Sequence, residues 1–123
     1  MSDLERVIRE YQPTEAAVAL VRNTKIALLT GISGAGKDTI KRRLLQSPSF
    51  RDIVSHTTRE PRANNGQPER DGVDYHFIDQ ATALTMLEHH QFIEAKFVHG
   101  KVYGTSTAEL QLAHDHQQTA ITD

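Results

Sequence analysis

Two glycines and a lysine near the start of the chain have the clearest chemical meaning. They belong to the segment Gly31-Ile32-Ser33-Gly34-Ala35-Gly36-Lys37, whose spacing is Gly-x-x-x-x-Gly-Lys. Glycines so spaced let backbone N–H groups curl around an anion, and a following helix adds the positive end of its dipole. The lysine then places an ammonium on the β- and γ-phosphates of a nucleoside triphosphate. The segment predicts a Walker A loop, with candidate phosphate contacts from Gly31, Ser33, Gly34, Ala35, Gly36, Lys37, Asp38 and Thr39.

The residue after this lysine departs from the Walker A pattern. Asp38 stands where Ser or Thr normally ligates Mg²⁺. A carboxylate is an oxygen ligand that suits Mg²⁺, although it adds negative charge near two phosphates, and Thr39 offers a hydroxyl directly or through water. We therefore treat Asp38 and Thr39 as candidate magnesium ligands. The alternative is a solvated aspartate that the helix dipole stabilises, and the sequence leaves both interpretations open.

The elements on either side of the loop are those that a Walker A loop requires. Residues 25–30 form an apolar run, which predicts a strand buried on both faces of a parallel sheet. Ile40, Leu44 and Leu45 mark a helix directly after the loop. A second strand is expected over residues 51–55. Strand, loop and helix in this order predict an α/β nucleotide-binding fold.

The segment before the first strand predicts two short helices over residues 3–22. Ser2 and Glu5 have the spacing of a capping box, and apolar residues then recur at helical period. Pro13 suits the first turn of the second helix. We interpret residues 1–23 as a helical extension packed on the domain that follows, with no function assigned.

A long polar segment follows the second strand. Residues 57–73 are rich in Arg, Asn, Gly and Pro and lack apolar periodicity, which is typical of a functional loop. A short strand is expected over residues 74–78, and Asp79 is a candidate cap of the next helix.

The second half of the chain predicts a hairpin and another helix. Residues 92–98 alternate between apolar and polar types and, with Val102-Tyr103, predict an antiparallel hairpin that turns near His99-Gly100. The final helix is expected to begin at Ser106 or Thr107.

The bulk composition is that of one ordinary globular domain. The chain has 123 residues, a net charge of −2 and no cysteine, which argues against a global nucleic-acid binder and excludes disulfides and thiolate metal sites. No apolar run is long enough to span a membrane, and the N-terminus lacks a signal peptide's pattern. The expected location is cytoplasmic. The seven histidines have no consistent metal spacing and are interpreted as surface polar residues.

Four separated motifs together resemble the guanylate kinase family of P-loop nucleoside monophosphate kinases. Beside the Walker A loop, the chain has Ser55-His56-Thr57-Thr58-Arg59-Glu60-Pro61-Arg62, Asp71-Gly72-Val73-Asp74-Tyr75-His76-Phe77, Phe92-Ile93-Glu94 and Tyr103-Gly104-Thr105. They occur in the family's order at nearly its spacing, from about residue 25 to the last residue. The resemblance covers roughly the N-terminal two-thirds of such a kinase.

The resemblance implies a GMP site, and the residue chemistry agrees with it. Arg59 and Arg62 can grip a phosphate with planar, permanently charged forks. Guanine presents two donors on one edge, so a carboxylate acceptor there, by resemblance Glu94, suits it. The implied GMP-binding set is Ser55, Arg59, Arg62, Tyr75, Glu94, Tyr103, Thr105 and Asp123, of which Asp123 is expected near the metal and the acceptor phosphate.

The resemblance also implies a reaction and a fold. The expected reaction is Mg²⁺-dependent transfer of a phosphoryl group from ATP to GMP in purine nucleotide metabolism, with Lys37, Arg59 and Arg62 as catalytic residues. The expected fold is α/β, with a parallel sheet, flanking helices and a small mixed GMP-binding subdomain. Residues 24–54 and 106–123 would form the core and residues 55–105 the subdomain.

Two departures from the family pattern stand out. The segment between Arg62 and Tyr75 is a few residues longer than usual and carries an Asn64-Asn65-Gly66 turn. The family's lid arginines, adenine pocket and last core strands have no counterpart after Asp123. We therefore expect a truncated form, as a monomer or homodimer, whose own turnover stays an open question.

Two other functions remain as alternatives at this point. A ribose 1,5-bisphosphate phosphokinase can carry Gly-Lys-Asp in its loop, as here, but has no use for the residues expected around GMP. A non-catalytic guanylate-kinase-like interaction module is the other, although such modules typically have degraded phosphate loops. Phosphorylation of GMP against ribose bisphosphate, and binding of ATP, discriminate these alternatives.

Overall fold

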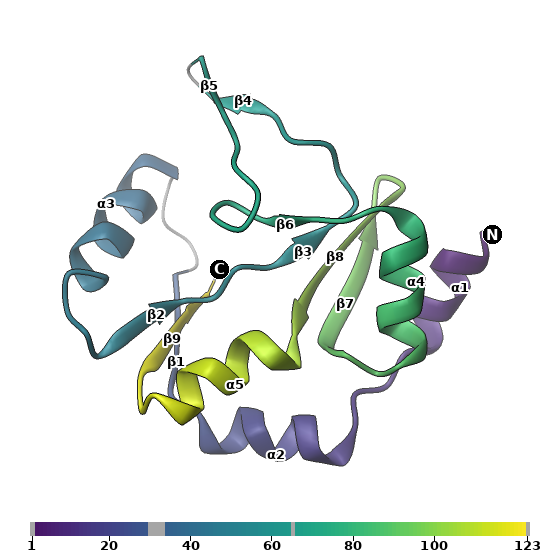
Figure 1. The fold of residues 1–123 in the computed structure, drawn as a ribbon, viewed down its shortest axis with the longest axis horizontal. Coiled ribbons are helices and arrows are strands. Elements are labelled where there is room, and N and C mark those ends of the chain that lie inside the picture. Colours follow the sequence, from purple (N-terminus) through teal and green to yellow (C-terminus); the bar gives the residue numbers. More distant parts are fainter. Residues whose placement is uncertain (1, 30–33, 65, 123) are drawn as a thin grey trace.

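The computed structural model describes residues 2–29, 34–64 and 66–122, and its elements form two main sheets with helices beside them (Figure 1). In chain order the elements are α1 (Asp3–Glu10), α2 (Glu15–Asn23), β1 (Ile26–Leu28), α3 (Gly34–Leu44), β2 (Phe50–Asp52), β3 (His56–Thr57), β4 (Ala63–Asn64), β5 (Gln67–Pro68), β6 (His76–Phe77), α4 (Gln80–Glu88), β7 (Phe92–Val98), β8 (Lys101–Ser106), α5 (Thr107–Asp115) and β9 (Thr119–Thr122).

The first sheet is parallel and has the order β1-β9-β2. The last strand of the chain thus lies between the first two, with Ile26 opposite Ala120 and Arg51 opposite Ala120 on the other side. Helices α2 and α5 pack beside this sheet, and its buried cluster consists of Leu20, Ile53, Leu110, Ala113 and Ala120. The predicted parallel sheet with flanking helices is confirmed.

Strand β1 differs from its prediction, because it is not buried on both faces. Leu28 is 64% exposed and Ile26 is 38% exposed. The reason is that both side chains line an open apolar cavity of about 420 Å³ together with Val21 and Leu110, so this face of the strand is not closely packed. Strand β2 also lies earlier than residues 51–55, although the backbone N–H of Ile53 still donates to Ile121 at 3.0 Å.

The second sheet is mixed and has the order β6-β3-β8-β7. Strand β3 pairs in parallel with β6 and antiparallel with β8, while β7 and β8 form the predicted hairpin. His99 and Gly100 make its turn with φ of 51° and 77°, a left-handed conformation that suits glycine at the second position. Ser106 caps α5, since its hydroxyl accepts the backbone N–H of Glu109 at 3.2 Å.

The long polar segment contains a small hairpin that the sequence did not predict. Strands β4 and β5 pair through Ala63 with Pro68, and Gly66 in the turn has φ of 77°. The expectation of an irregular segment is therefore wrong over residues 63–68, because the Asn-rich turn lets its flanks pair. Asn65 lies outside the described residues.

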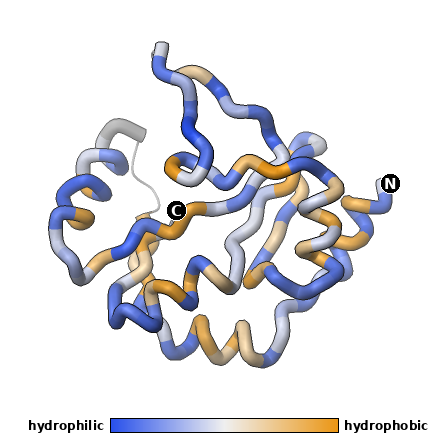
Figure 2. Tube along the Cα trace, viewed as in Figure 1, coloured by the Kyte–Doolittle hydropathy of each residue, from blue (hydrophilic) through white to orange (hydrophobic). Residues whose placement is uncertain are grey.

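The two N-terminal helices attach to different sheets. Helix α1 packs on α4 and β7, where Leu4 and Ile8 join the buried cluster of Leu87 and Phe92, while α2 packs on α5. Both helices contain apolar segments, which are orange in Figure 2. Ser2 caps α1 as predicted. Pro13 lies before the cap of α2 rather than in its first turn, because the hydroxyl of Thr14 accepts the N–H of Ala17 at 3.1 Å and so sets the helix start.

Tyr11 joins the end of α1 to the start of β7. Its hydroxyl donates to the carbonyl of Phe92 and accepts the backbone N–H of the same residue at 3.0 Å. Burial raises the pKa of Tyr11 above its usual range, so the hydroxyl keeps its proton. One side chain thus satisfies two backbone groups at the buried beginning of the strand.

We predict that Tyr11→Phe lowers the free energy of unfolding by about 1–2 kcal/mol, because both backbone groups of Phe92 lose their partner. Urea unfolding followed by circular dichroism measures this change. Arg6→Ala is the control, since it breaks only the exposed Arg6–Asp3 pair at 3.5 Å. That change is expected to stay below about 0.5 kcal/mol. A Tyr11→Phe midpoint equal to that of the wild type would contradict the assignment.

Candidate functional site

A pocket of about 180 Å³ lies where the ends of the two sheets meet. Five of the predicted acceptor-site residues line it: Ser55, Tyr75, Glu94, Tyr103 and Thr105. They come from the β2–β3 connection, the start of β6, and strands β7 and β8. The remaining lining residues are Lys41, Ile53, Asp74, Lys96, Gly104 and Thr122. The fold therefore gathers residues as far apart in the sequence as Lys41 and Thr122.

Glu94 and Thr105 face each other across the β7–β8 hairpin. They are register partners, and the hydroxyl of Thr105 donates to Oε1 of Glu94 at 3.1 Å. An irregularity in the pairing between Phe92 and Glu94 allows Phe92 to be buried while Glu94 lines the pocket. The result is an exposed carboxylate beside a hydroxyl, which is an arrangement suited to a ligand edge with two donors.

Gly104 lies between the two pocket residues of β8 and contacts the core on its other side. A Cβ at this position would lie 2.8 Å from two ring atoms of Phe92 and 3.0 Å from the carbonyl oxygen of Glu94. Any larger residue would push β8 away from β7. Gly104 therefore sets how closely Tyr103 and Thr105 approach the opposite strand.

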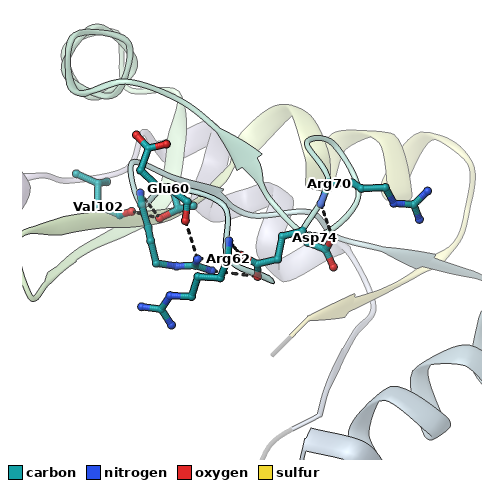
Figure 3. Close-up of polar contacts among 8 residues, drawn as sticks. Glu60, Arg62, Arg70, Asp74 and Val102 are labelled. Carbon is teal, nitrogen blue, oxygen red and sulfur yellow. Dashed lines mark hydrogen bonds and ion pairs between the residues drawn. The ribbon is translucent and has the colours of Figure 1, made fainter. Parts of the chain in front are cut away.

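A tight loop orients Tyr75. The carboxylate of Asp74 accepts the N–H of Arg70 at 2.7 Å (Figure 3). Gly72, with φ of 80°, donates its N–H to the carbonyl of Tyr75 at 2.7 Å. The Tyr75 ring then lies 6.1 Å from that of Tyr103, centroid to centroid. Two phenol rings thus meet at one side of the pocket.

Arg59 is buried and held by Glu69. Its Nη1 donates to Oε1 of Glu69 at 2.8 Å and its Nη2 to Oε2 at 3.2 Å, while Nη1 also donates to the carbonyl of Glu60 at 2.9 Å. The hydrogen bonds with Glu69 raise the pKa of Arg59 and lower the pKa of Glu69. The guanidinium carbon lies 5.2 Å from the centre of the Tyr75 ring, so Arg59 borders the pocket through that tyrosine.

Arg62 reaches the same carboxylate through its backbone. Its N–H donates to Oε1 of Glu69 at 2.7 Å, whereas the residue itself is exposed. Figure 3 shows Arg62 close to Glu60 on the other side of the view from Arg70. Glu69 was not singled out from the sequence, because it stands among several charged residues between Arg62 and Tyr75. Only its burial distinguishes it.

The phosphate-loop residues are described in part. Gly31 and Ser33 lie outside the described residues, and so does Asp123. Helix α3 begins at Gly34, which puts Ala35, Gly36 and Lys37 in its first turn, as the Walker A interpretation requires. Asp38 and Thr39 are exposed near the start of the helix.

Lys41, one helical turn after Lys37, is a further residue that the sequence did not single out. Its ammonium lies 3.4 Å from the carboxylate of Asp52 on β2, and its side chain lines the acceptor pocket. Helix α3 therefore connects the candidate phosphate loop with the pocket.

His56 and His76 lie side by side on neighbouring strands and are half-buried, so the expectation that the histidines are surface residues is wrong for these two. Their rings are 4.5 Å apart, and Nε2 of His76 lies 2.6 Å from a carboxylate oxygen of Glu109 on α5. Nδ1 of His56 is buried and has no hydrogen-bond partner within the described residues. Burial, followed by the nearby His76, lowers the pKa of His56. Strand pairing buries these rings, which their spacing did not reveal.

We predict a stability loss on acidification that depends on His56. Its folded-state pKa lies below the ordinary 6.5, so the unfolded chain binds more protons as the pH falls through 6.5. The free energy of unfolding therefore falls below that pH and levels off once the folded form also takes up the proton. His56→Gln is expected to flatten this fall, as thermal unfolding measured between about pH 7 and about pH 5 will show. The exposed His89→Gln is the control, and equal slopes for all three proteins would contradict the prediction.

The sequence model described as guanylate kinase matches residues 23–123. The chain belongs to the guanylate kinase family. The guanylate kinase of Methylobacillus flagellatus is 42% identical over 87 residues, which are 70% of this chain and 41% of that protein. That of Syntrophotalea carbinolica is 40% identical over 103 residues, 83% of this chain and 47% of that one.

One eukaryotic relative and one solved structure, both guanylate kinases, also match the chain. The guanylate kinase of Schizosaccharomyces pombe is 37% identical over 101 residues, 80% of this chain and 48% of that protein. The crystal structure of guanylate kinase from Anaplasma phagocytophilum matches with a TM-score of 0.55 and 25% identity, over 80% of this chain and 47% of that one. The chain thus spans about half the length of the curated relatives it matches. Most of α1 and α2 lies before the family match, and no described helix is long and apolar enough to cross a membrane.

Proposed function

We propose that the pocket between the sheets binds GMP and that the whole protein transfers a phosphoryl group from ATP to it. The observation that carries this proposal is the gathering of Ser55, Tyr75, Glu94, Tyr103 and Thr105 around one pocket, with buried Arg59 next to it. We also propose residues 55–105 as the GMP-binding subdomain, with residues 24–54 and 106–123 as the core.

In this proposal, guanine is recognised by residues of the β7–β8 hairpin and by the residue just before β3. The Glu94 carboxylate accepts the ring N–H and the exocyclic amino group of guanine, while Thr105 and Ser55 supply further polar contacts. Adenine offers an acceptor at the ring nitrogen where guanine has a donor, so it would leave the carboxylate badly paired. The Thr105–Glu94 hydrogen bond supports this role because it already orients the carboxylate.

The phosphate of GMP is bound by arginines and tyrosines. Arg59 lies against Tyr75, and Tyr75 lies against Tyr103, so one guanidinium and two phenolic hydroxyls converge at one side of the pocket. The exposed side chain of Arg62 is long enough to turn toward the same anion. Charged donors suit a phosphate dianion better than neutral ones, since such hydrogen bonds are about twice as strong.

The donor triphosphate is held at the start of α3. Lys37 and the backbone of residues 31–39 bind its phosphates, and the helix dipole adds to the attraction. The exposed side-chain oxygens of Asp38 and Thr39 are ligands that suit Mg²⁺. Consecutive residues of a helix point in different directions, so we do not expect both to bind the ion directly. When bound, Mg²⁺ neutralises charge on the phosphates. Asp123 lies outside the described residues, and the resemblance alone keeps it in the proposed set near the acceptor phosphate.

Positioning supplies most of the catalysis in this proposal. The acceptor phosphate attacks the terminal phosphoryl group of ATP in line, and ADP leaves without a covalent enzyme intermediate. Two anions repel each other, so Lys37, Arg59 and Arg62 must offset their charge while they are held in contact. Lys41, on the helix that follows the phosphate loop, lines the acceptor pocket, which supports a short distance between the two anions.

We predict that Glu94→Gln weakens GMP binding about ten- to a hundredfold, because a buried donor edge loses its charged acceptor. The variant should also lose its preference for GMP over IMP, which lacks the exocyclic amino group. Calorimetric titration with both nucleotides measures this, with Glu88→Gln, exposed at the end of α4, as the matched control. An unchanged GMP-to-IMP preference in Glu94→Gln would refute the assigned role.

We predict that Asp38→Ala weakens binding of Mg·ATP more than binding of metal-free ATP, because only the first involves the metal shell. Titrations with and without Mg²⁺ give the two affinities. Asp115→Ala, which removes an exposed carboxylate on α5, controls for the change in net charge. Equal losses for both forms of ATP would favour a solvated aspartate instead.

A further inference from the structure

We propose that Glu69 is a positioning residue for the acceptor phosphate: it fixes the guanidinium of Arg59 and the backbone of Arg62 before the nucleotide arrives. The inference rests on the proposed GMP site and adds a residue to it. Glu69 itself does not need to touch the nucleotide, because its carboxylate is already occupied by both arginines.

Three hydrogen bonds converge on this one carboxylate. Nη1 and Nη2 of Arg59 donate to its two oxygens at 2.8 and 3.2 Å, and the N–H of Arg62 donates to Oε1 at 2.7 Å. The two side chains are only 10% and 9% exposed, unlike the surface ion pairs of α1. A bidentate pair removed from water fixes the plane of the guanidinium, whereas a surface pair leaves it mobile.

The N–H groups of Arg59 are shared among several partners. Glu69 and the carbonyl of Glu60 use three of the five guanidinium N–H groups. The guanidinium also faces the two phenols beside the pocket, because, after Glu69, hydrogen bonding to Tyr103 and Tyr75 helps to raise the pKa of Arg59. It lies 5.2 Å from the centre of the Tyr75 ring, whose residue lines the pocket. Arg59 is therefore held on one edge by Glu69 and meets the pocket tyrosines on the other.

Hydrogen bonds also fix the backbone of Glu69 relative to that of Arg62. Its own N–H donates to the carbonyl of Arg62 at 2.7 Å, while its carboxylate accepts the N–H of Arg62. These two bonds close the β4–β5 hairpin at its base. The extra residues between Arg62 and Tyr75 thus return the chain to a point where Glu69 meets both arginines.

The positioning role of Glu69 and its negative charge predict opposite effects on GMP binding when the carboxylate is removed. A negative carboxylate weakens the attraction of the arginines for a phosphate, so charge alone predicts that its removal strengthens GMP binding. Fixing an arginine side chain before binding, however, moves the entropy cost of ordering its rotamers from the binding step to folding. The double hydrogen bond and the burial favour the second effect.

The test compares GMP with guanosine, which has the same base and sugar but no phosphate. Calorimetric titrations use the full chain as wild type, Glu69→Gln and Glu60→Gln. Glu60→Gln is the matched control, since it makes the same charge change on an exposed side chain next to Arg59. Thermal unfolding checks that each variant is folded.

We expect Glu69→Gln to weaken GMP binding about tenfold or more, because a buried charged hydrogen bond is lost, and to leave guanosine binding within about twofold. Glu60→Gln should change neither affinity. Unchanged or tighter GMP binding by Glu69→Gln overturns the inference, and so does an equal loss for both ligands, which would indicate a purely structural role.

A second measurement separates failure of this inference from failure of the proposed function. Nitrogen-15 NMR of the unliganded chain should show slowly exchanging guanidinium protons of Arg59 in the wild type and in Glu60→Gln, but not in Glu69→Gln. Fast exchange in the wild type overturns the role of Glu69 whatever the nucleotide does. Wild-type binding of GMP no tighter than that of guanosine would instead refute the phosphate site.

Discussion

The contact between Gly104 and the ring of Phe92 is the constraint on which most of the second sheet depends. Phe92 is fully buried, and the absent side chain at Gly104 allows β8 to lie directly against it. Tyr103 and Thr105, on either side of this glycine, both line the pocket. The same phenylalanine has both backbone groups bonded to Tyr11. Packing in the core therefore determines where the pocket residues stand.

Charge is distributed locally rather than over the whole molecule. The chain as a whole carries a net charge of −2, yet two arginines donate to one carboxylate beside the pocket, and His76 on β6 meets Glu109 on α5. The buried guanidinium of Arg59 has an acidic partner, as the high cost of an isolated buried charge demands. A nearly neutral protein can thus place arginine donors beside a pocket for a small anion.

The sequence predicted the parallel sheet, the β7–β8 hairpin and most helix starts, because caps and alternating patterns are local signals. It also named five of the residues that line the pocket, since their motifs resemble a known family. It failed where burial depends on partners far along the chain. Leu28 is exposed because its side chain lines an open cavity, and His56 is half-buried because β6 lies beside it. Glu69 could not be recognised, because nothing in its neighbours distinguishes it from other acidic residues in the loop.

The two N-terminal helices have a mechanical consequence. Helix α1 is fastened to the mixed sheet and α2 to the parallel sheet, and only residues 11–14 connect them. That connection is itself restrained, because the carbonyl of Gln12 lies 3.2 Å from Nδ1 of His90. Any change in the angle between the sheets must therefore bend or stretch four residues that are anchored at both ends. Residues that precede the family match thus bridge the two sheets whose side chains line the pocket.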